Sequence, residues 1–310
     1  MSWDFEIVLG PLGGTTEGPA WDGESLFFTH VSESKIYKFD PITNEAEVFR
    51  RNTNLANGMS FDAEGNLYAC EGGARRVVRY NQESTEVIAD SIYGKKLNIP
   101  NDIAIDAEGN VWFTDPFYEG AGGEWSKDRS NKETNYDSVC RVDMLDGQPS
   151  AVTRMTEDTT RPNGLLFSLD FKTLYVAQSG TLPEEKRQLW AYPVKADDTL
   201  GPYEIIHDFG RYRGVDGMVL DTEGNIIAAA GLSNNWEQKD MDFVVGGPGP
   251  MLYVFSSSGE LLETHPTPVD RPANCTFGGE DLSVLYVTTG EGYLLRAFTD
   301  RQGRLNYPKS

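Results

Sequence analysis

The 310-residue sequence is poor in basic residues. It has 27 Lys and Arg against 48 Asp and Glu, which gives a formal net charge of −21 at pH 7. Such an excess of negative charge repels the phosphate backbone of nucleic acids and anionic membrane surfaces. We therefore expect neither a nucleic acid nor a membrane as a partner.

Cysteine and histidine are scarce as well, with three of each. Cys70, Cys140 and Cys275 lie far apart and form no Cys-x-x-Cys pair, which argues against a disulfide framework or a thiolate zinc site. With so few histidines and no Gly-x-Ser-x-Gly segment, a Ser-His-Asp triad has little support. We expect the reducing cytoplasm as the location.

Long apolar runs are also missing. No segment reaches the ~18 apolar residues that a membrane-spanning helix requires, and the opening residues MSWDFEIVLG lack the basic and apolar regions of a signal peptide. We expect a soluble, unprocessed protein. Turn-forming residues are abundant, with 32 Gly and 16 Pro, and this composition favours many short strands joined by turns.

Six segments repeat one hairpin pattern. Three are near copies, SFDAEGNLYAC from Ser60, AIDAEGNVWFT from Ala104 and VLDTEGNIIAA from Val219. Looser copies begin at positions 20, 167 and 277. Each segment reads as an apolar strand, a polar turn with Gly or Asp, and a second strand rich in β-forming residues.

An oxygen-bearing side chain stands three or four residues before every copy, at the opening of its first strand. These six residues are Glu17, Asn57, Asn101, Asn163, Asp216 and Asn274. Their intervals of 40, 44, 62, 53 and 58 residues fit a unit of four strands, the size of a propeller blade. We predict an all-β, six-bladed β-propeller with four antiparallel strands per blade, one domain over residues 1–310. The N-terminal strand DFEIVL is expected to complete the last blade.

In a propeller, the innermost strands line a central channel, so one equivalent position per blade forms a ring around it. Asn and Asp also favour turns, and any single one of these residues could serve only that purpose. Six at one register, including Glu17, favour a functional ring. Two carboxylates and four amides are hard oxygen donors that suit Ca²⁺ in the channel, with other divalent cations as alternatives.

The face that carries the ring is expected to carry long loops. The segments 117–137 and 232–250 are polar and contain glycine, which is typical of lids and binding loops, although a solvated insertion is the alternative. His30, Glu71 and Asp115 stand where second strands are expected to end on this face. These three residues are candidates for contact with the substrate.

Five motifs in order resemble those of the SMP-30/gluconolactonase/luciferin-regenerating-enzyme-like family of calcium-binding lactonases, over essentially the whole chain. They are TEGPAW, PNDIAID, RPNGLLFS, VDGMVLD and CTFGGEDLSVLYVTT. The resemblance implies Glu17, Asn163 and Asp216 as metal ligands, Asn101 as a direct or water-mediated fourth ligand, and Asp102 beside them. Ile99 is a departure, because animal gluconolactonases of the family have there an arginine that contacts sugar hydroxyls.

These features predict a calcium-dependent hydrolase that opens a small-molecule lactone. The cation would polarise the carbonyl oxygen, and Asp216 would activate water, with Asp102 as the second candidate for this role. Asn57, Asn101 and Asn274 are predicted to contact the substrate. A phosphotriesterase or fluorophosphatase on the same metal and a non-enzymatic propeller scaffold are alternatives. The sequence leaves a monomer or a homodimer open.

Overall fold

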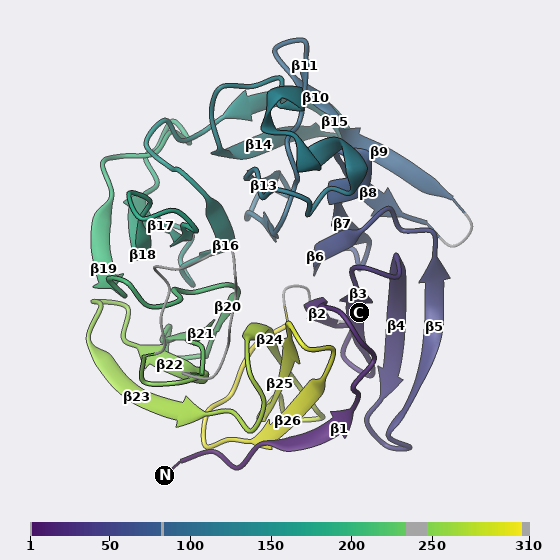
Figure 1. Ribbon diagram of the computed structural model, residues 1–310, viewed down its shortest axis with the longest axis vertical. Coiled ribbons are helices and arrows are strands. Elements are labelled where there is room, and N and C mark those ends of the chain that lie inside the picture. Colours follow the sequence, from purple (N-terminus) through teal and green to yellow (C-terminus); the bar gives the residue numbers. More distant parts are fainter. Residues whose placement is uncertain (1, 82–83, 234–246, 306–310) are drawn as a thin grey trace.

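The computed structural model describes residues 2–81, 84–233 and 247–305. Six four-stranded antiparallel sheets are arranged around a central axis (Figure 1). The predicted six-bladed β-propeller is therefore confirmed. From the channel outward, the strands are β2 (Thr16–Trp21), β3 (Leu26–His30), β4 (Lys35–Asp40) and β5 (Glu45–Arg51) in blade 1, and β6 (Ala56–Phe61), β7 (Leu67–Glu71), β8 (Arg76–Tyr80) and β9 (Thr85–Ala89) in blade 2.

The same order continues around the ring. Blade 3 has β12 (Ile103–Ile105), β13 (Val111–Asp115), β14 (Ser138–Leu145) and β15 (Gln148–Arg154), and blade 4 has β16 (Pro162–Phe167), β17 (Thr173–Ser179), β18 (Arg187–Pro193) and β19 (Glu204–Asp208). Blade 5 has β20 (Met218–Leu220), β21 (Ile226–Ala230), β22 (Met251–Phe255) and β23 (Leu261–Pro266). Blade 6 has β24 (Pro272–Gly278), β25 (Val284–Thr289) and β26 (Leu294–Phe298) from the C-terminal part, with β1 (Glu6–Leu9) outside them.

The outermost strand of blade 6 comes from the other end of the chain. Strand β1 pairs antiparallel with β26, with Glu6 opposite Arg296 and Ile7 opposite Leu295. The Arg296 side chain also donates a hydrogen bond to the Glu6 carboxylate at 2.6 Å. Strands from both ends of the chain thus share one sheet, and this pairing closes the ring of blades (Figure 1).

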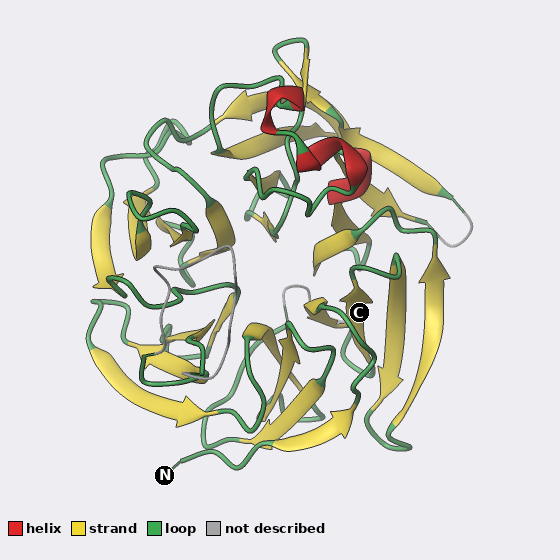
Figure 2. Cartoon of the chain, viewed as in Figure 1, coloured by secondary structure: helices red, strands yellow, loops and turns green. Residues whose placement is uncertain are grey.

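Little of the chain lies outside the blades. A short hairpin joins β10 (Ser91–Ile92) to β11 (Lys95–Lys96), and η1 (Gly72–Ala74) is a single 3₁₀ turn. Two more 3₁₀ turns, η2 (Glu124–Lys127) and η3 (Arg129–Asn131), lie in the long loop after β13 (Figure 2). Among the described residues, no helix has the length and apolar character needed to cross a membrane.

The hydrophobic core lies between neighbouring blades. One cluster joins Phe27 and Ile36 of blade 1 to Met59 and Val78 of blade 2, all of them buried. Equivalent clusters join the other blades because each strand presents alternate residues to its two neighbours. Because this core lies between the blades, the side chains that face the channel do not have to be apolar.

The most regular part of the repeat is a hairpin turn stabilised by an Asp side chain. In each near copy, the Asp of the turn accepts a hydrogen bond from the backbone N–H four residues later, at 2.8 Å in all three. These pairs are Asp62 with Asn66, Asp106 with Asn110, and Asp221 with Asn225. The repeated turn carboxylates therefore stabilise hairpins, at the end of the channel opposite the ring.

Candidate active site

The ring residues stand where the innermost strands lose regular pairing. The register of blade 1 shifts between Glu17 and Ala20, and equivalent shifts lie between residues 56 and 59 and between 162 and 165. A β-bulge of this kind turns a side chain away from the regular alternation of the strand. Four of the six ring residues are followed by glycine, which fits this irregular backbone.

Two of these glycines, Gly58 and Gly217, let a side chain of the next blade approach closely. A Cβ on Gly58 would lie 2.3 Å from Oδ1 of Asp102, and a Cβ on Gly217 would lie 2.0 Å from Cγ of Asn274. Asp102 itself stands where four of the blades have glycine. Its carboxylate joins those of Glu17 and Asp216 at one end of the channel.

These three carboxylates lie near enough to repel one another. Burial raises the pKa of Glu17 well above its usual value, and repulsion by Asp216 and Asp102 adds to this. Burial, with repulsion by Asp216, raises the pKa of Asp102 to about 7. Mutual repulsion of this kind is relieved by a bound cation.

Asp216 also has a cationic neighbour that no sequence motif indicated. Arg213 donates a hydrogen bond from Nη2 to Oδ2 of Asp216 at 2.5 Å. Burial raises the pKa of Asp216, and the positive charges of Arg213 and Arg271 counteract that effect. A charged residue three positions before the ring carboxylate was the available signal, but its direction could not be read from the sequence.

Two of the four amide side chains contact the carboxylates. Nδ2 of Asn274 donates to Oδ2 of Asp102 at 3.4 Å, and the Asn163 side chain hydrogen-bonds Asp216. Oδ1 of Asn57 is buried and has no hydrogen-bond partner among the described residues. Asn101 is buried, and its backbone N–H donates to the Thr114 carbonyl at 2.9 Å.

This donor set can be compared with the needs of a metal ion. Within residues 2–81, 84–233 and 247–305, no three His, Cys, Asp or Glu side chains form a metal-binding group by themselves. A cation here would need amide or water oxygens in addition to the carboxylates. Buried carboxylates that repel one another, with the amide of Asn163 beside Asp216, fit a hard cation such as Ca²⁺.

The three candidates at strand ends have different surroundings. The carboxylate of Glu71 accepts hydrogen bonds from Arg76 at 2.7 Å, the Tyr80 hydroxyl at 2.8 Å and Asn54 at 2.9 Å. Its oxygens are thus satisfied within blade 2 and its adjoining loop. None of these three bonds reaches the ring.

Asp115 and His30 each keep an unsatisfied atom. Oδ2 of Asp115 accepts from the Asn98 N–H at 2.8 Å, whereas its Oδ1 is buried without a partner in the described part of the chain. Nε2 of His30 contacts the Gly13 carbonyl, and its Nδ1 is likewise buried and unpaired. Both residues end second strands, as expected from the sequence.

The loop after β13 brings one more residue to the ring. Tyr118, at its start, has its hydroxyl 3.4 Å from Nδ2 of Asn163. Burial and the negative charge of Asp216 raise the pKa of Tyr118. The sequence indicates this loop as a candidate binding loop but points to no residue within it. Of the other expected loop, 232–250, residues 234–246 lie outside the described residues.

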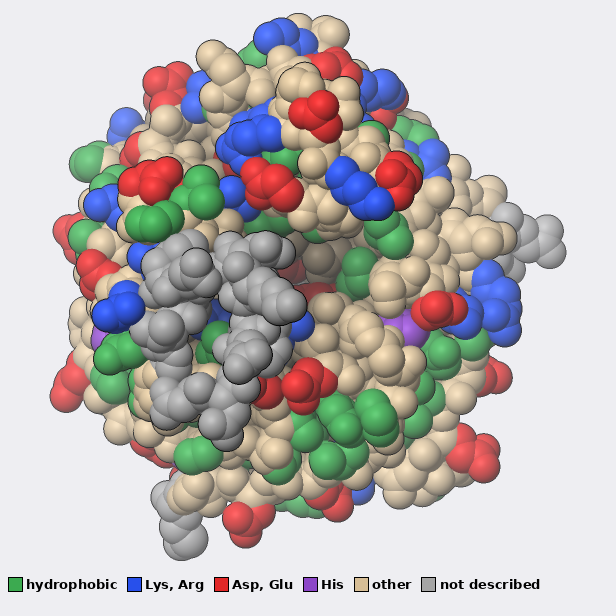
Figure 3. All heavy atoms as spheres, in the orientation of Figure 1, with side chains coloured by type: hydrophobic (Ala, Val, Ile, Leu, Met, Phe, Trp, Pro, Cys, Tyr) green, Lys and Arg blue, Asp and Glu red, His purple; other side chains and the backbone are tan. Residues whose placement is uncertain are grey.

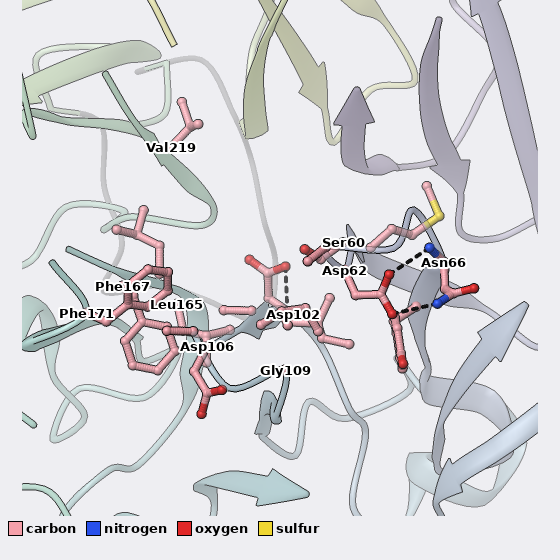
Figure 4. Close-up of a pocket in the computed structure, with 18 of the residues that line it drawn as sticks. Ser60, Asp62, Asn66, Asp102, Asp106, Gly109, Leu165, Phe167, Phe171 and Val219 are labelled. Carbon is pink, nitrogen blue, oxygen red and sulfur yellow. Dashed lines mark hydrogen bonds between the residues drawn. The ribbon is translucent and has the colours of Figure 1, made fainter. Parts of the chain in front are cut away.

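The channel continues beneath the ring as a cavity of about 670 Å³ (Figure 4). Asp102 and Asn274 line its inner end, and apolar residues such as Leu165 and Phe167 form its walls. Its outer rim carries turn carboxylates such as Asp106. The face that carries the long loop is also hollowed at its centre, with acidic side chains at the bottom of the hollow (Figure 3).

A six-bladed propeller with carboxylates and amides converging in its channel defines the class of the protein. The chain belongs to the SMP-30/gluconolactonase/LRE-like family, whose family model matches residues 15–291. This confirms the resemblance seen in the motifs. A gluconolactonase from Zymomonas mobilis is 27% identical over 304 residues, which cover 90% of this chain and 77% of the relative.

Two further proteins support the assignment to this family. Pentonolactonase XacC from Haloferax volcanii is 25% identical over 282 residues, which cover 89% of this chain and 81% of the relative. The solved structure of XC5397 from Xanthomonas campestris, described as a gluconolactonase, matches with a TM-score of 0.77 at 26% identity, covering 95% of this chain and 89% of that one.

Proposed function

We propose that the protein is a calcium-dependent lactonase. The convergence of the three carboxylates of Glu17, Asp102 and Asp216 with amides at one end of the channel carries this proposal. Glu17, Asn163, Asp216 and Asn101 would hold the cation. The names of its relatives, gluconolactonase and pentonolactonase, support lactones as the substrate class.

The bound cation would supply a Lewis acid that polarises the lactone carbonyl oxygen. Asp216 acts as the general base: Arg213 orients the carboxylate through its Oδ2, and the carboxylate accepts a proton from water. The water oxygen bonds to the carbonyl carbon, the ring C–O bond breaks, and the product is a hydroxy acid. Asp102, which lies beside Asp216, is the second candidate for the base.

Aldonolactones are the proposed substrates, with the amides of Asn57, Asn101 and Asn274 as partners for their hydroxyl groups. Ile99 is buried and lies close to Gly72, so it offers no polar group to a sugar. Asp115 and His30 stay candidates for substrate contact, and Glu71 is the weakest because its oxygens are already bonded.

The remaining parts of this proposal concern the setting of the enzyme. The three free, buried cysteines are compatible with a reducing cytoplasm. A monomer or homodimer remains the expected state, and sedimentation of the purified protein would distinguish the two.

The test begins with protein stripped of metal by a chelator. Acid release is followed on aldonolactones, simple aliphatic lactones and a phosphotriester, with and without added Ca²⁺. Lactone hydrolysis that returns with Ca²⁺ supports the proposal. Turnover of the phosphotriester alone would instead assign a phosphotriesterase, and no turnover with retained Ca²⁺ binding would assign a binding protein.

Two variants and one control accompany this assay. We expect Asp216→Asn to lose at least about 100-fold in turnover at saturating Ca²⁺ while staying folded, because the general base is gone. In wild type, Ca²⁺ at one hundred times its Kd should add about 2.7 kcal/mol to the free energy of unfolding. Glu17→Gln should weaken that stabilisation, whereas Glu64→Gln, in an exposed turn, should not.

A further inference from the structure

Tyr118 presents a hydroxyl group to the side of the ring where the long loop begins. Its oxygen lies 3.4 Å from Nδ2 of Asn163 and 3.4 Å from the Ser179 carbonyl oxygen. Both distances are long for hydrogen bonds, so the hydroxyl can exchange its present partner for a substrate oxygen at small cost. The side chain is also only partly buried.

The aromatic side chain of Tyr118 is held in place by neighbouring charged residues. The guanidinium of Arg161 lies over it, 5.3 Å from the ring centroid. Arg161 is fixed in turn by Glu119 at 3.0 Å and Glu185 at 2.8 Å. This second layer of contacts orients the phenol before a substrate arrives.

The backbone beside Tyr118 is equally constrained. Phe117 is buried and packs edge-on against Trp125. Its backbone N–H donates to Oδ2 of Asp137 at 3.0 Å, and Lys132 pairs with the same carboxylate. The start of the loop is therefore a fixed element rather than a solvated insertion.

We propose that Tyr118 is a further catalytic residue, whose hydroxyl donates a hydrogen bond to the ring oxygen of the lactone as that oxygen leaves. This inference rests on the proposed function. Water adds to the carbonyl carbon and gives its proton to Asp216. The bond from that carbon to the ring oxygen then breaks, and the proton passes from Asp216 to the departing oxygen, which Tyr118 stabilises in the meantime.

Geometry favours Tyr118 for this role. The carbonyl oxygen and the ring oxygen of a lactone are bonded to the same carbon, so a donor to the ring oxygen has to lie beside the groups that bind the carbonyl end. Tyr118 lies beside Asn163, a proposed ligand, and close enough to Asp216 to feel its charge. A protonated phenol can donate a hydrogen bond. The alkoxide that develops on the ring oxygen needs such a donor.

The test compares Tyr118→Phe with wild type on two lactones with different leaving groups. δ-Valerolactone releases a strongly basic alkoxide, whereas dihydrocoumarin releases a much less basic phenolate that needs little help. Tyr136→Phe is the matched control, because Tyr136 lies in the same loop, is partly buried, and has the Arg154 guanidinium 3.9 Å from its ring centroid. The Kd for Ca²⁺ is measured for each variant.

We expect Tyr118→Phe to reduce kcat on δ-valerolactone about 100-fold, as for the loss of one donor to a developing oxyanion, and on dihydrocoumarin about twofold. The Kd for Ca²⁺ and the control variant should stay unchanged. Equal losses on both lactones, or no loss, would overturn the role of Tyr118 and leave the lactonase proposal standing. Wild-type protein that opens neither these lactones nor aldonolactones would overturn the proposed function, and this inference with it.

Discussion

Arg213 donates a hydrogen bond from Nη2 to Oδ2 of Asp216 at 2.5 Å, and the same guanidinium links two blades. Its Nη1 donates to the Pro272 carbonyl of β24 at 2.9 Å and to the Gly231 carbonyl at 3.3 Å. The proposed base is therefore oriented by a side chain that is itself anchored at the junction of blades 5 and 6. Removing that side chain should disturb the carboxylate without removing it.

We predict that Arg213→Lys lowers kcat on the best lactone by about 10–100-fold, a range typical of partners that orient a metal-site group. Lysine keeps the positive charge but cannot form this forked set of hydrogen bonds. Steady-state kinetics at saturating Ca²⁺ would measure the effect, with exposed Arg211→Lys as the control. Full activity in Arg213→Lys would show that Asp216 does not depend on this contact.

The repeat predicted that Glu17 and Asp216 lie near each other in the channel, whereas it did not predict the contacts that Arg213 and Tyr118 make there. Glu17 and Asp216 could be aligned because each opens a hairpin of constant register, and a propeller brings equal registers together. Arg213 and Tyr118 lie in segments outside the repeat, where the path of the chain depends on contacts from distant residues. Spacing along the sequence carries no information about such contacts.

A similar limit applies to Glu71 and Asp115. Their positions at strand ends followed from the repeat, and the structure places them there. Their hydrogen bonds depend on Arg76, Tyr80 and Asn98, whose side-chain directions no local pattern specifies. Position within a blade was therefore accessible from the sequence, and the chemical environment was not.

Asp115 provides a test based on pH. Burial raises the pKa of Asp115 to about 8, with the charge of Asp137 adding to the effect, whereas an unfolded Asp has a pKa of about 3.9. Between these values the native state holds a proton that the unfolded state has lost. The free energy of unfolding should therefore fall as pH rises from about 4 to about 8, by no more than about 1.4 kcal/mol per pH unit from this group.

We predict that Asp115→Asn removes this part of the pH dependence, because asparagine keeps an oxygen that can accept the Asn98 N–H. Urea unfolding of the metal-free protein at pH 5 and pH 8 measures the difference between variant and wild type. Buried carboxylates that do not interact with Asp115 contribute equally to both proteins and cancel in that comparison. Asp146→Asn, in an exposed turn, should retain the wild-type slope, and a variant slope equal to wild type for Asp115→Asn would refute the prediction.

Gly217 of blade 5 packs against Asn274, the ring residue of blade 6. We expect this contact to couple the effects of substitutions at the two positions on stability. Gly217 is not among the glycines with positive φ, so alanine there meets no backbone strain. Its Cβ would instead lie 2.0 Å from Cγ, 2.2 Å from Oδ1 and 2.4 Å from Nδ2 of Asn274. We predict that Gly217→Ala lowers the free energy of unfolding by about 1–3 kcal/mol, as for overpacking in a core.

Because the clash is with side-chain atoms, it can be removed from the other side. Asn274→Ala deletes all three of those atoms, so Gly217→Ala should cost much less in an Asn274→Ala background. Urea unfolding of the four proteins of this double-mutant cycle gives the coupling directly. An equal cost of Gly217→Ala in both backgrounds would mean that the penalty arises elsewhere and that Asn274 does not depend on a glycine in the neighbouring blade.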